Sequence, residues 1–412
     1  MNAIARPYDL AAIRADFPIL GRQVYGKPLV YLDNGASAQK PRQVMDAMTR
    51  LMSEDYANVH RGLHYLANAS TEAYEDARET VRRFLNAASS EEIVFCRSST
   101  GGLNMLASCL GRHLNIGQGD EIILSIMEHH SNIVPWHFWR ERHGAVIKWA
   151  PVDEDGNFLI DEFERLITPR TKVVALTHMS NALGTIVPIA EVAKLTRAAG
   201  VPLVVDGSQG AVHLPVDVQT LGADFYVFTG HKVYGPTGIG AVWGRKEWLE
   251  KLPPFEGGGE MIVTVTTDAV TYNDPPHRFE AGTPAIIEAV GLGAALKYMM
   301  ALGSEQILAH ENRLRDYAHE RLGRMNSIRI IGKAANKGAI VSFEMAGAHA
   351  HDVATVIDRS GVAVRAGTHC TMPLMTRFGV TSTCRASFGL YNTLEEVDKL
   401  ADALAKAESL FA

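Results

Sequence analysis

Short apolar runs recur along the first 290 residues of the chain, and segments with helical spacing separate several of them. Continuous apolar strands that are joined by helices are typical of a parallel sheet buried on both faces. The pattern therefore predicts an α/β fold with a mostly parallel, seven-stranded sheet between helices. The expected strands are residues 91–95, 120–125, 145–150, 172–176, 202–206, 224–228 and 240–244.

Two helices in this region have clear signals. Residues 189–200 carry an apolar face and end at Gly200, a residue type that commonly stops helices. Residues 285–303 form the most apolar long stretch, but Glu288 and Lys297 interrupt it. This stretch predicts a buried helix and not a membrane span.

The pattern changes after about residue 304, where a long charged helix, a strand-like run and further helices follow. Thr393 and Glu396 form a capping box that opens the last helix. We therefore expect a smaller α+β domain at this end of the chain. The predicted division is an N-terminal segment, 1–25, that packs with this small domain, a large domain, 26–295, and the small domain, 296–412.

Composition and charge narrow the classes of function. The chain has 412 residues, 47% of them hydrophobic, and a formal net charge of −6, which gives no reason to expect nucleic acid as a partner. The first twenty residues carry charges in every apolar stretch and do not read as a secretory signal. Four cysteines are too few for a disulfide framework in so long a chain. We expect a cytoplasmic protein that binds no membrane.

Polar residues gather directly after five of the expected strands. In a parallel sheet these are the carboxyl ends of the strands, where ligands bind, so that one shared site is expected. The residues are Ser98 to Gly102, His129 and His130, His178 and Asn181, Asp206 with Ser208 and Gln209, and Thr229 with His231 and Lys232.

The residue types predict the ligand. The turn at 98–102 opens a helix and can seat a phosphate. An aspartate at a strand end needs a cationic partner, and a lysine screened from water becomes nucleophilic toward carbonyl groups. Pyridoxal phosphate meets these demands, because its aldehyde can form a Schiff base with Lys232 while Asp206 keeps the ring nitrogen protonated. A near-match to an ATPase phosphate loop at 21–27 lacks the strand-to-helix setting and is set aside.

Two histidine clusters raise the alternative of a metal site. One is Glu128 with His129 and His130, and the other is His349 and His351 with Asp352. Neither has the spacing of a zinc motif, and we expect no metal. His349 and His351 are expected in the turn before a helix.

Several longer motifs resemble those of the cysteine desulfurases, which are class V, fold-type I enzymes dependent on pyridoxal phosphate. These motifs are MEHHSNIVPW, DGSQGAVH, FTGHKVYGPTGIG, RFEAGTP and RAGTHCTMPLM, and the resemblance runs from YLDNGASAQKP at 31–41 to TCRASFGLYNT at 383–393. It is closest to the SUF branch, which serves iron–sulfur cluster assembly, because the cysteine loop between Arg365 and Met375 is short.

The resemblance implies a role for each matching residue. Lys232 would carry the cofactor and move protons, and His129 would stack on its ring. Asp206 and Gln209 would bind the ring, while Thr100, Gly101, Thr229 and His231 would hold the phosphate. Thr283 would reach the phosphate of a neighbouring subunit, which implies a homodimer. Asn181 and Arg385 would bind the carboxylate of the substrate, and Arg365 would help to place the loop that carries Cys370. Cys370 would be the nucleophile.

The resemblance also implies the reaction. L-Cysteine would be converted to L-alanine, with the sulfur left as a persulfide on Cys370, and a sulfur-acceptor protein of the SUF system would then collect it. L-Selenocysteine is an alternative substrate. The thiolate is the reactive form of cysteine, so positive potential from His369 and Arg365 is expected beside Cys370. Cys96, Cys109 and Cys384 lie in apolar or strand-like runs and are expected to be structural.

Two departures from the family pattern and two alternatives stay open. Gly101 stands where the family often has Glu, and Thr229 where it often has Ser. Another enzyme of the same fold is one alternative: an aminotransferase, a β-lyase or a selenocysteine lyase. An inactive scaffold of this fold is the other, although Lys232, Asp206, His129 and Cys370 are all present.

Overall fold

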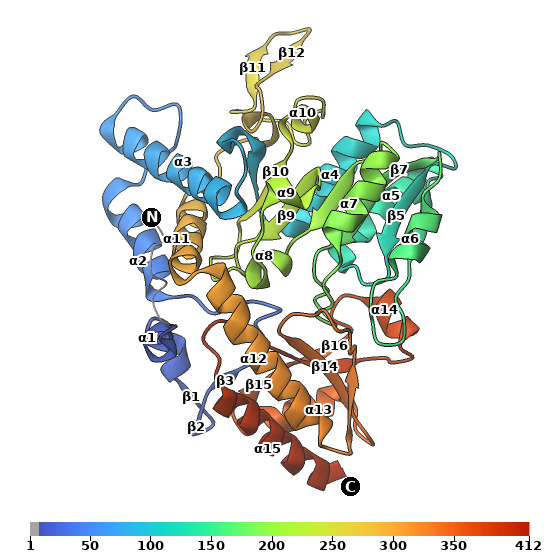
Figure 1. Ribbon diagram of the computed structural model, residues 1–412. Coiled ribbons are helices and arrows are strands. Elements are labelled where there is room, and N and C mark those ends of the chain that lie inside the picture. Colours follow the sequence, from blue (N-terminus) through green and yellow to red (C-terminus); the bar gives the residue numbers. More distant parts are fainter. Residues whose placement is uncertain (1–7, 412) are drawn as a thin grey trace.

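The protein is built around a seven-stranded sheet (Figure 1), as the computed structural model of residues 8–411 shows. All seven expected strands are confirmed, with ends shifted by at most two residues, and only β10 runs against the others. The spatial order is β4 (Ile93–Cys96), β10 (Gly240–Gly244), β9 (Phe225–Thr229), β8 (Leu203–Asp206), β7 (Thr171–Thr177), β5 (Glu121–Ser125) and β6 (Val146–Ala150).

Alternate residues of each strand enter different cores. In β9, for example, Tyr226 and Phe228 pack in one buried cluster, and Phe225 and Val227 pack in the other. This period of two is the geometry of a strand that is covered on both faces. One cluster is completed by α3 (Tyr65–Leu85), α6 (Ile160–Leu166), α7 (Ile189–Ala198) and α11 (Ile286–Leu302), and the other by α4 (Ser99–His113), α5 (Val134–His143) and α10 (Lys246–Leu249).

The two helices expected in this region are confirmed as α7 and α11. Gly200 follows α7 with φ +66°, a left-handed conformation that glycine adopts at little cost. Within residues 8–411, no single helix is long and apolar enough to cross a membrane. Helices α11 and α12 (Ser304–Gly323) meet the length and hydropathy criteria only when they are taken together, and the chain bends by 79° between them.

A second, antiparallel sheet of four strands lies below the first in Figure 1. Helices α12, α13 (Ala350–Asp358) and α15 (Leu394–Phe411) pack on it around a third apolar cluster. The capping box of α15 is confirmed: the Thr393 N–H donates to Glu396 Oε2 (3.1 Å), and the Glu396 N–H donates to Thr393 Oγ1 (3.2 Å). The strand order is β13 (Ile328–Ile331), β14 (Ile340–Met345), β17 (Thr383–Ser387) and β16 (Arg365–Gly367).

The N-terminal part of the chain reaches this second sheet. Strand β3 (Val30–Tyr31) pairs in parallel with β15 (Val362–Ala363), and Asp33 forms a bridge with Ser387. Arg14 donates to the Tyr391 carbonyl and pairs with Glu396 (3.0 Å). The three-part division of the chain stays a prediction, and residues 1–7 of its first segment lie outside the described residues.

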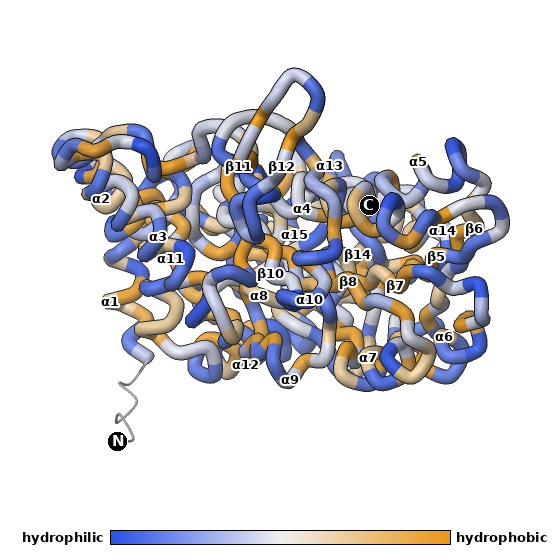
Figure 2. The backbone as a smooth tube through the Cα atoms, turned by 90° about the horizontal axis from the view of Figure 1, so that it is seen from above, coloured by the Kyte–Doolittle hydropathy of each residue, from blue (hydrophilic) through white to orange (hydrophobic). Residues whose placement is uncertain are grey.

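The remaining elements connect these layers. A hairpin projects from the body of the molecule in two perpendicular views (Figures 1 and 2), and it consists of β11 (Ile262–Val265) and β12 (Val270–Tyr272). The other strands and helices are β1 (Gln23–Val24), β2 (Lys27–Pro28), α1 (Leu10–Ala15), α2 (Arg42–Arg50), α8 (Gly210–His213), α9 (Val218–Leu221) and α14 (Met372–Arg377).

Candidate active site

A cavity of about 700 Å³ lies at the carboxyl ends of the large sheet and also takes residues from β16 and β17. It brings ten of the thirteen predicted site residues together, while Gly101, Thr229 and Thr283 do not line it. The ten are Thr100, His129, Asn181, Asp206, Gln209, His231, Lys232, Arg365, Cys370 and Arg385.

One end of the cavity is the start of helix α4. Ser98 caps the helix, since its hydroxyl accepts a hydrogen bond from the Gly101 N–H (3.2 Å). The helix approaches the sheet closely because Gly102 has no side chain: a Cβ there would lie 2.6 Å from Val242 and 2.9 Å from Val227. The free N–H groups of this first turn form a natural anion seat.

A chain of hydrogen bonds fixes His129 beside this helix start. Thr100 Oγ1 and Ser131 Oγ are 2.7 Å apart, and His129 Nδ1 accepts from the Ser131 N–H (3.1 Å). Burial, with Lys232 nearby, lowers the pKa of His129 to about 4. His129 is therefore a neutral ring at pH 7, with its proton on Nε2.

Asp206 is held at the end of β8. Its Oδ1 accepts from the Ser208 N–H (3.0 Å) and the Ser208 hydroxyl (2.6 Å), and its side chain is buried. Gln209 is fixed through Nε2, which donates to the Gly35 carbonyl (2.8 Å). These contacts orient one carboxylate and one amide toward a shared cavity.

Lys232 stands in a tight loop after β9. A Cβ at Gly240 would lie 2.8 Å from both the Phe228 carbonyl oxygen and the Ser98 backbone, so that only glycine lets the three segments converge there. Burial lowers the pKa of Lys232 to about 8, although Asp206 acts in the opposite direction. A much larger share of this amine is thus unprotonated at pH 7 than in an ordinary lysine.

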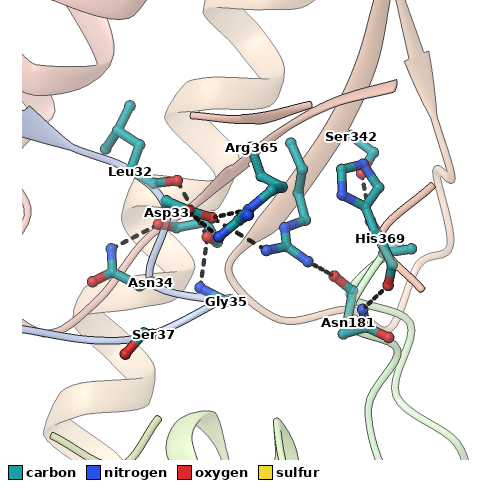
Figure 3. Close-up of polar contacts among 12 residues, drawn as sticks. Leu32, Asp33, Asn34, Gly35, Ser37, Asn181, Ser342, Arg365 and His369 are labelled. Atoms are coloured by element: carbon teal, nitrogen blue, oxygen red, sulfur yellow. Dashed lines mark hydrogen bonds and ion pairs between the residues drawn. The ribbon is translucent and has the colours of Figure 1, made fainter. Parts of the chain in front are cut away.

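Two arginines of the small sheet line this cavity, and Figure 3 shows one of them, Arg365, beside Asp33. The Arg385 guanidinium is buried, and its Nη1 donates to the Asn181 carbonyl (2.8 Å). Arg365 Nη2 lies 2.8 Å from Asp33 Oδ2, and Arg385 Nη2 lies 3.4 Å from Asp33 Oδ1. One carboxylate therefore bridges both guanidinium groups.

The loop that carries Cys370 has a strained backbone. His369 and Cys370 have φ of +52° and +58°, which is costly for residues with side chains. Three hydrogen bonds hold them: Asn181 Nδ2 to the His369 carbonyl (2.7 Å), the His130 N–H to the Cys370 carbonyl (2.8 Å), and the Thr371 N–H to the Thr368 carbonyl (3.0 Å). The thiol of Cys370 is exposed.

The expectation that His369 supplies positive potential to Cys370 is wrong. His369 is buried, and its Nε2 lies 2.8 Å from Thr383 Oγ1. Burial, with Arg385 and Arg365 nearby, lowers the pKa of His369 to about 3, so that the ring is neutral at pH 7. Arg365 remains as the charged residue of this loop.

The other three cysteines are thiols in protected settings. Burial raises the pKa of Cys96 and Cys384 to about 12 and that of Cys109 to about 11. Of the four cysteines, only Cys370 lines the cavity. This contrast singles out Cys370 as the reactive thiol.

The three predicted residues outside the cavity lie close to it in the fold. Thr229 Oγ1 is buried at the end of β9 without a hydrogen-bond partner. Gly101 and Thr283 line a second cavity of about 600 Å³, which shares Thr100 with the first. A Cβ at Gly101 would meet only Ser98 Oγ at 3.9 Å. Nothing in the structure explains why glycine replaces the family's glutamate there.

The model of one protein family, described as aminotransferase class-V, matches residues 30–400 of this chain. The chain belongs to the aminotransferase class-V family. A probable cysteine desulfurase of Streptomyces coelicolor is 48% identical to this class-V protein over 98% of both chains. A crystal structure of an Escherichia coli cysteine desulfurase has a TM-score of 0.91 and 38% identity, covering 99% of this chain and 100% of its own.

Both of these relatives carry the name cysteine desulfurase, in one case as a probable one. Some relatives are longer than this chain. The chain spans 57% of a probable cysteine desulfurase of Mycolicibacterium paratuberculosis, at 48% identity, and 64% of one of Mycobacterium leprae. Enzymes of this family depend on pyridoxal phosphate.

The residues present fit that cofactor. The start of α4 and the unpartnered hydroxyl of Thr229 offer donors for a phosphate. Asp206 offers a fixed carboxylate for a protonated ring nitrogen, and Lys232 offers an amine of lowered pKa for the aldehyde. His129 and Gln209 line the same cavity.

The lowered pKa of Lys232 predicts how cofactor-free protein takes up pyridoxal phosphate. Only the unprotonated amine attacks an aldehyde, so the rate of uptake should rise about tenfold per pH unit below pH 8 and level off above it. The rise in absorbance of the bound cofactor after mixing measures this rate. A rate that keeps rising tenfold between about pH 9 and 10 would indicate an ordinary lysine.

Two residues of the site were missed in the sequence. Ser131 lies two positions after His129, and a hydroxyl so close to a predicted site histidine could have been noticed. Asp33 lies 332 residues from Arg365, and no local pattern predicts their pairing. It becomes visible only when β3 joins β15 in the fold.

Proposed function

We propose that this protein is a cysteine desulfurase that converts L-cysteine to L-alanine and retains the sulfur as a persulfide on Cys370. The observation that carries the proposal is the meeting of Lys232, Asp206 and the exposed Cys370 in one cavity. An aminotransferase or β-lyase has no use for a thiol held there.

Substrate binding is proposed for residues of both sheets, Arg385 on β17 and Asn181 after β7. Arg385 and Asn181 are the donors proposed for the carboxylate of L-cysteine, since Arg385 is charged, buried and part of the cavity wall. Arg365, on β16, is half-exposed at the start of the cysteine loop. The substrate's thiol would then face Cys370.

The chemical steps divide between an amine and a thiol. Pyridoxal phosphate, when bound, draws electrons from the substrate's α-carbon. Lys232 is the base proposed to take the α-proton, and its low pKa suits that task at neutral pH. The thiolate of Cys370 attacks the substrate sulfur, so that an S–S bond forms while the substrate's C–S bond breaks. The proton lost by the Cys370 thiol balances the one gained by the carbon of the alanine product.

The direct test is the product ratio. Holoenzyme is incubated with L-cysteine and a thiol reductant, and alanine and sulfide are measured in the same samples. Equal amounts are expected, because each alanine leaves one persulfide that the reductant releases as sulfide. Pyruvate with sulfide would instead indicate a β-lyase, and 3-mercaptopyruvate with neither alanine nor sulfide would indicate a transaminase.

We further propose a homodimer. The second cavity is lined by both Gly101 and Thr283, and large apolar side chains are exposed on the projecting hairpin and at the start of α3. Val263, Val265 and Tyr272 on the hairpin, and Leu63 and Tyr65, are the main examples. A second copy would bury this surface. Light scattering during size-exclusion chromatography should give twice the mass of the 44.9 kDa chain.

The cysteine loop and the free thiols support two further proposals, a sulfur-acceptor protein and a cytoplasmic compartment. The hydrogen-bonded loop limits the reach of Cys370, which favours a docking acceptor protein of the SUF system for iron–sulfur assembly. Transfer of labelled sulfur to such a purified acceptor is the test. Free cysteines suit a reducing cytoplasm, which cell fractionation would check.

A further inference from the structure

Glu128 is a buried acid that the proposed mechanism does not use. It belongs, with His129 and His130, to one of the two histidine clusters of the sequence, and its side chain is fully buried. Its chain neighbour His129 and its hydrogen-bond partner Thr177 both line the main cavity, whereas Glu128 lies behind that lining. A carboxylate is costly to bury unless it is paired, so the groups that surround this one show its role.

Three hydrogen bonds tie the Glu128 carboxylate to two strands and one turn. Oε1 accepts from the Ser125 hydroxyl (2.5 Å) at the end of β5 and from the Thr177 N–H (3.0 Å) at the end of β7, the neighbouring strand. Oε2 accepts from Asn132 Nδ2 (2.8 Å). The Ser125 hydroxyl itself accepts from the Met127 N–H (3.2 Å), which leaves its proton for Glu128. Three donors and no acceptor around the acid fit its ionised form.

Asn132 is fixed in the orientation that this contact needs. Its Oδ1 accepts from Trp136 Nε1 (3.3 Å), and Trp136 is buried in the second apolar cluster. A reversed amide would leave the indole N–H without an acceptor and would set an oxygen against the Glu128 carboxylate. Burial raises the pKa of Glu128 to about 7, although the three donors act in the opposite direction. The carboxylate that Asn132 faces is therefore the main form at pH 8.

The contact between Glu128 and Asn132 closes the turn that carries His129 and His130. The His129 ring lies in the cavity on one side of this turn. On the other side, the His130 N–H donates to the Cys370 carbonyl (2.8 Å), and His130 Nε2 accepts from a backbone N–H of the same loop (3.2 Å). A displacement of the turn would move the ring and the cysteine loop together.

We propose that Glu128 is a positioning residue, which fixes the turn of residues 128–132 and thereby sets the His129 ring and the Cys370 loop relative to the large sheet. This inference rests on the proposed function, because both residues act in that reaction. Two neighbouring strands hold the carboxylate, and reacting groups need such rigid support to stay within about 0.5 Å of their productive positions.

The first test is Glu128→Gln, which keeps an oxygen for Ser125 and Thr177 but turns an amide NH2 group toward Asn132 Nδ2, so that two donors face each other. Holoenzyme is assayed with L-cysteine at pH 8. We expect kcat per bound cofactor to fall about 10²-fold and KM to change less than about threefold, because the reacting groups are misplaced while the substrate's arginine is kept. The visible circular dichroism of the bound cofactor, which needs no turnover, should be about halved.

A reversed pair gives the sharper comparison. With Glu128→Gln and Asn132→Asp together, the amide at position 128 can donate to the carboxylate at position 132, which still accepts from Trp136 Nε1. This variant should recover kcat to within about fivefold of the wild type, together with most of the circular dichroism. Asn132→Asp alone sets two carboxylates face to face and should lose at least as much activity as Glu128→Gln. A reversed pair that folds, binds the cofactor and stays about 10²-fold slow would overturn the proposal, even if Glu128→Gln itself does not fold.

The matched control is Glu121→Gln, at the opposite end of β5. Glu121 is also buried, accepts from Thr168 Oγ1 (2.6 Å) and pairs with Lys148 (2.8 Å), but it lies away from the cavity. Its variant should lower the melting temperature yet change kcat and the circular dichroism less than about twofold. Equal effects in both glutamate variants, or none in Glu128→Gln, would contradict a positioning role. Failure of the desulfurase proposal would appear separately, as wild-type enzyme that makes no alanine from L-cysteine.

Discussion

Replacement of Cys370 by alanine should lower the production of alanine and sulfide from L-cysteine by about 10³-fold or more. Cys370 is the one thiol in the cavity, and the other three have raised pKa values in buried or half-buried settings. No other nucleophilic sulfur can then accept the substrate's sulfur atom. Both products are measured under single- and multiple-turnover conditions, with the cofactor absorbance as a check that the site is loaded.

The matched control is Cys109→Ala. Cys109 is buried in α4, away from the cavity, and the loss of one sulfur atom there should cost about 1 kcal/mol of stability and little activity. A Cys370→Ala enzyme that still releases sulfide at the wild-type rate would show that the chemistry is that of a β-lyase, in which sulfide leaves without a protein thiol.

Replacement of Lys232 by alanine should remove both covalent attachment of the cofactor and turnover. Wild-type protein that is loaded with pyridoxal phosphate and reduced with borohydride should carry one pyridoxyl label on the peptide that contains Lys232. The variant should carry none, and its rate should fall by about 10³-fold or more, because the proposed base at the α-carbon is lost with the amine.

Lys40 provides a sharp control for this experiment. Burial lowers the pKa of Lys40 to about 8 as well, so it resembles Lys232 in electrostatics. Its ammonium group, however, donates to the carbonyl groups of Ala38 and His231, and it does not line the cavity. Lys40→Gln should keep the label. A label on Lys40 in the wild type, or one that survives in Lys232→Ala, would contradict the assignment.

Much of the fold was predictable because its strands are short, apolar and uninterrupted. The run at 240–244 was placed without error, and the capping box of α15 formed with the two expected hydrogen bonds. The direction of β10 was not predictable, since a buried strand reads the same whichever way it runs.

The site was predictable to the extent that its residues follow strands. Asp206 and Lys232 could be placed together because the carboxyl ends of parallel strands share one edge of the sheet. The state of His369 could not be predicted, because it depends on burial beside Thr383. Asp33 was missed for a similar reason, since its partners come from distant strands.

The left-handed backbone at His369 and Cys370 has a consequence for sulfur delivery. A mobile loop could bring its cysteine to acceptor proteins that bind at different distances. A thiol that is held at one point would require the proposed acceptor protein to bring its own acceptor atom to that point. Selectivity among acceptor proteins would then depend on how well their surfaces fit around Cys370. An acceptor could be designed to fit this one position of the thiol.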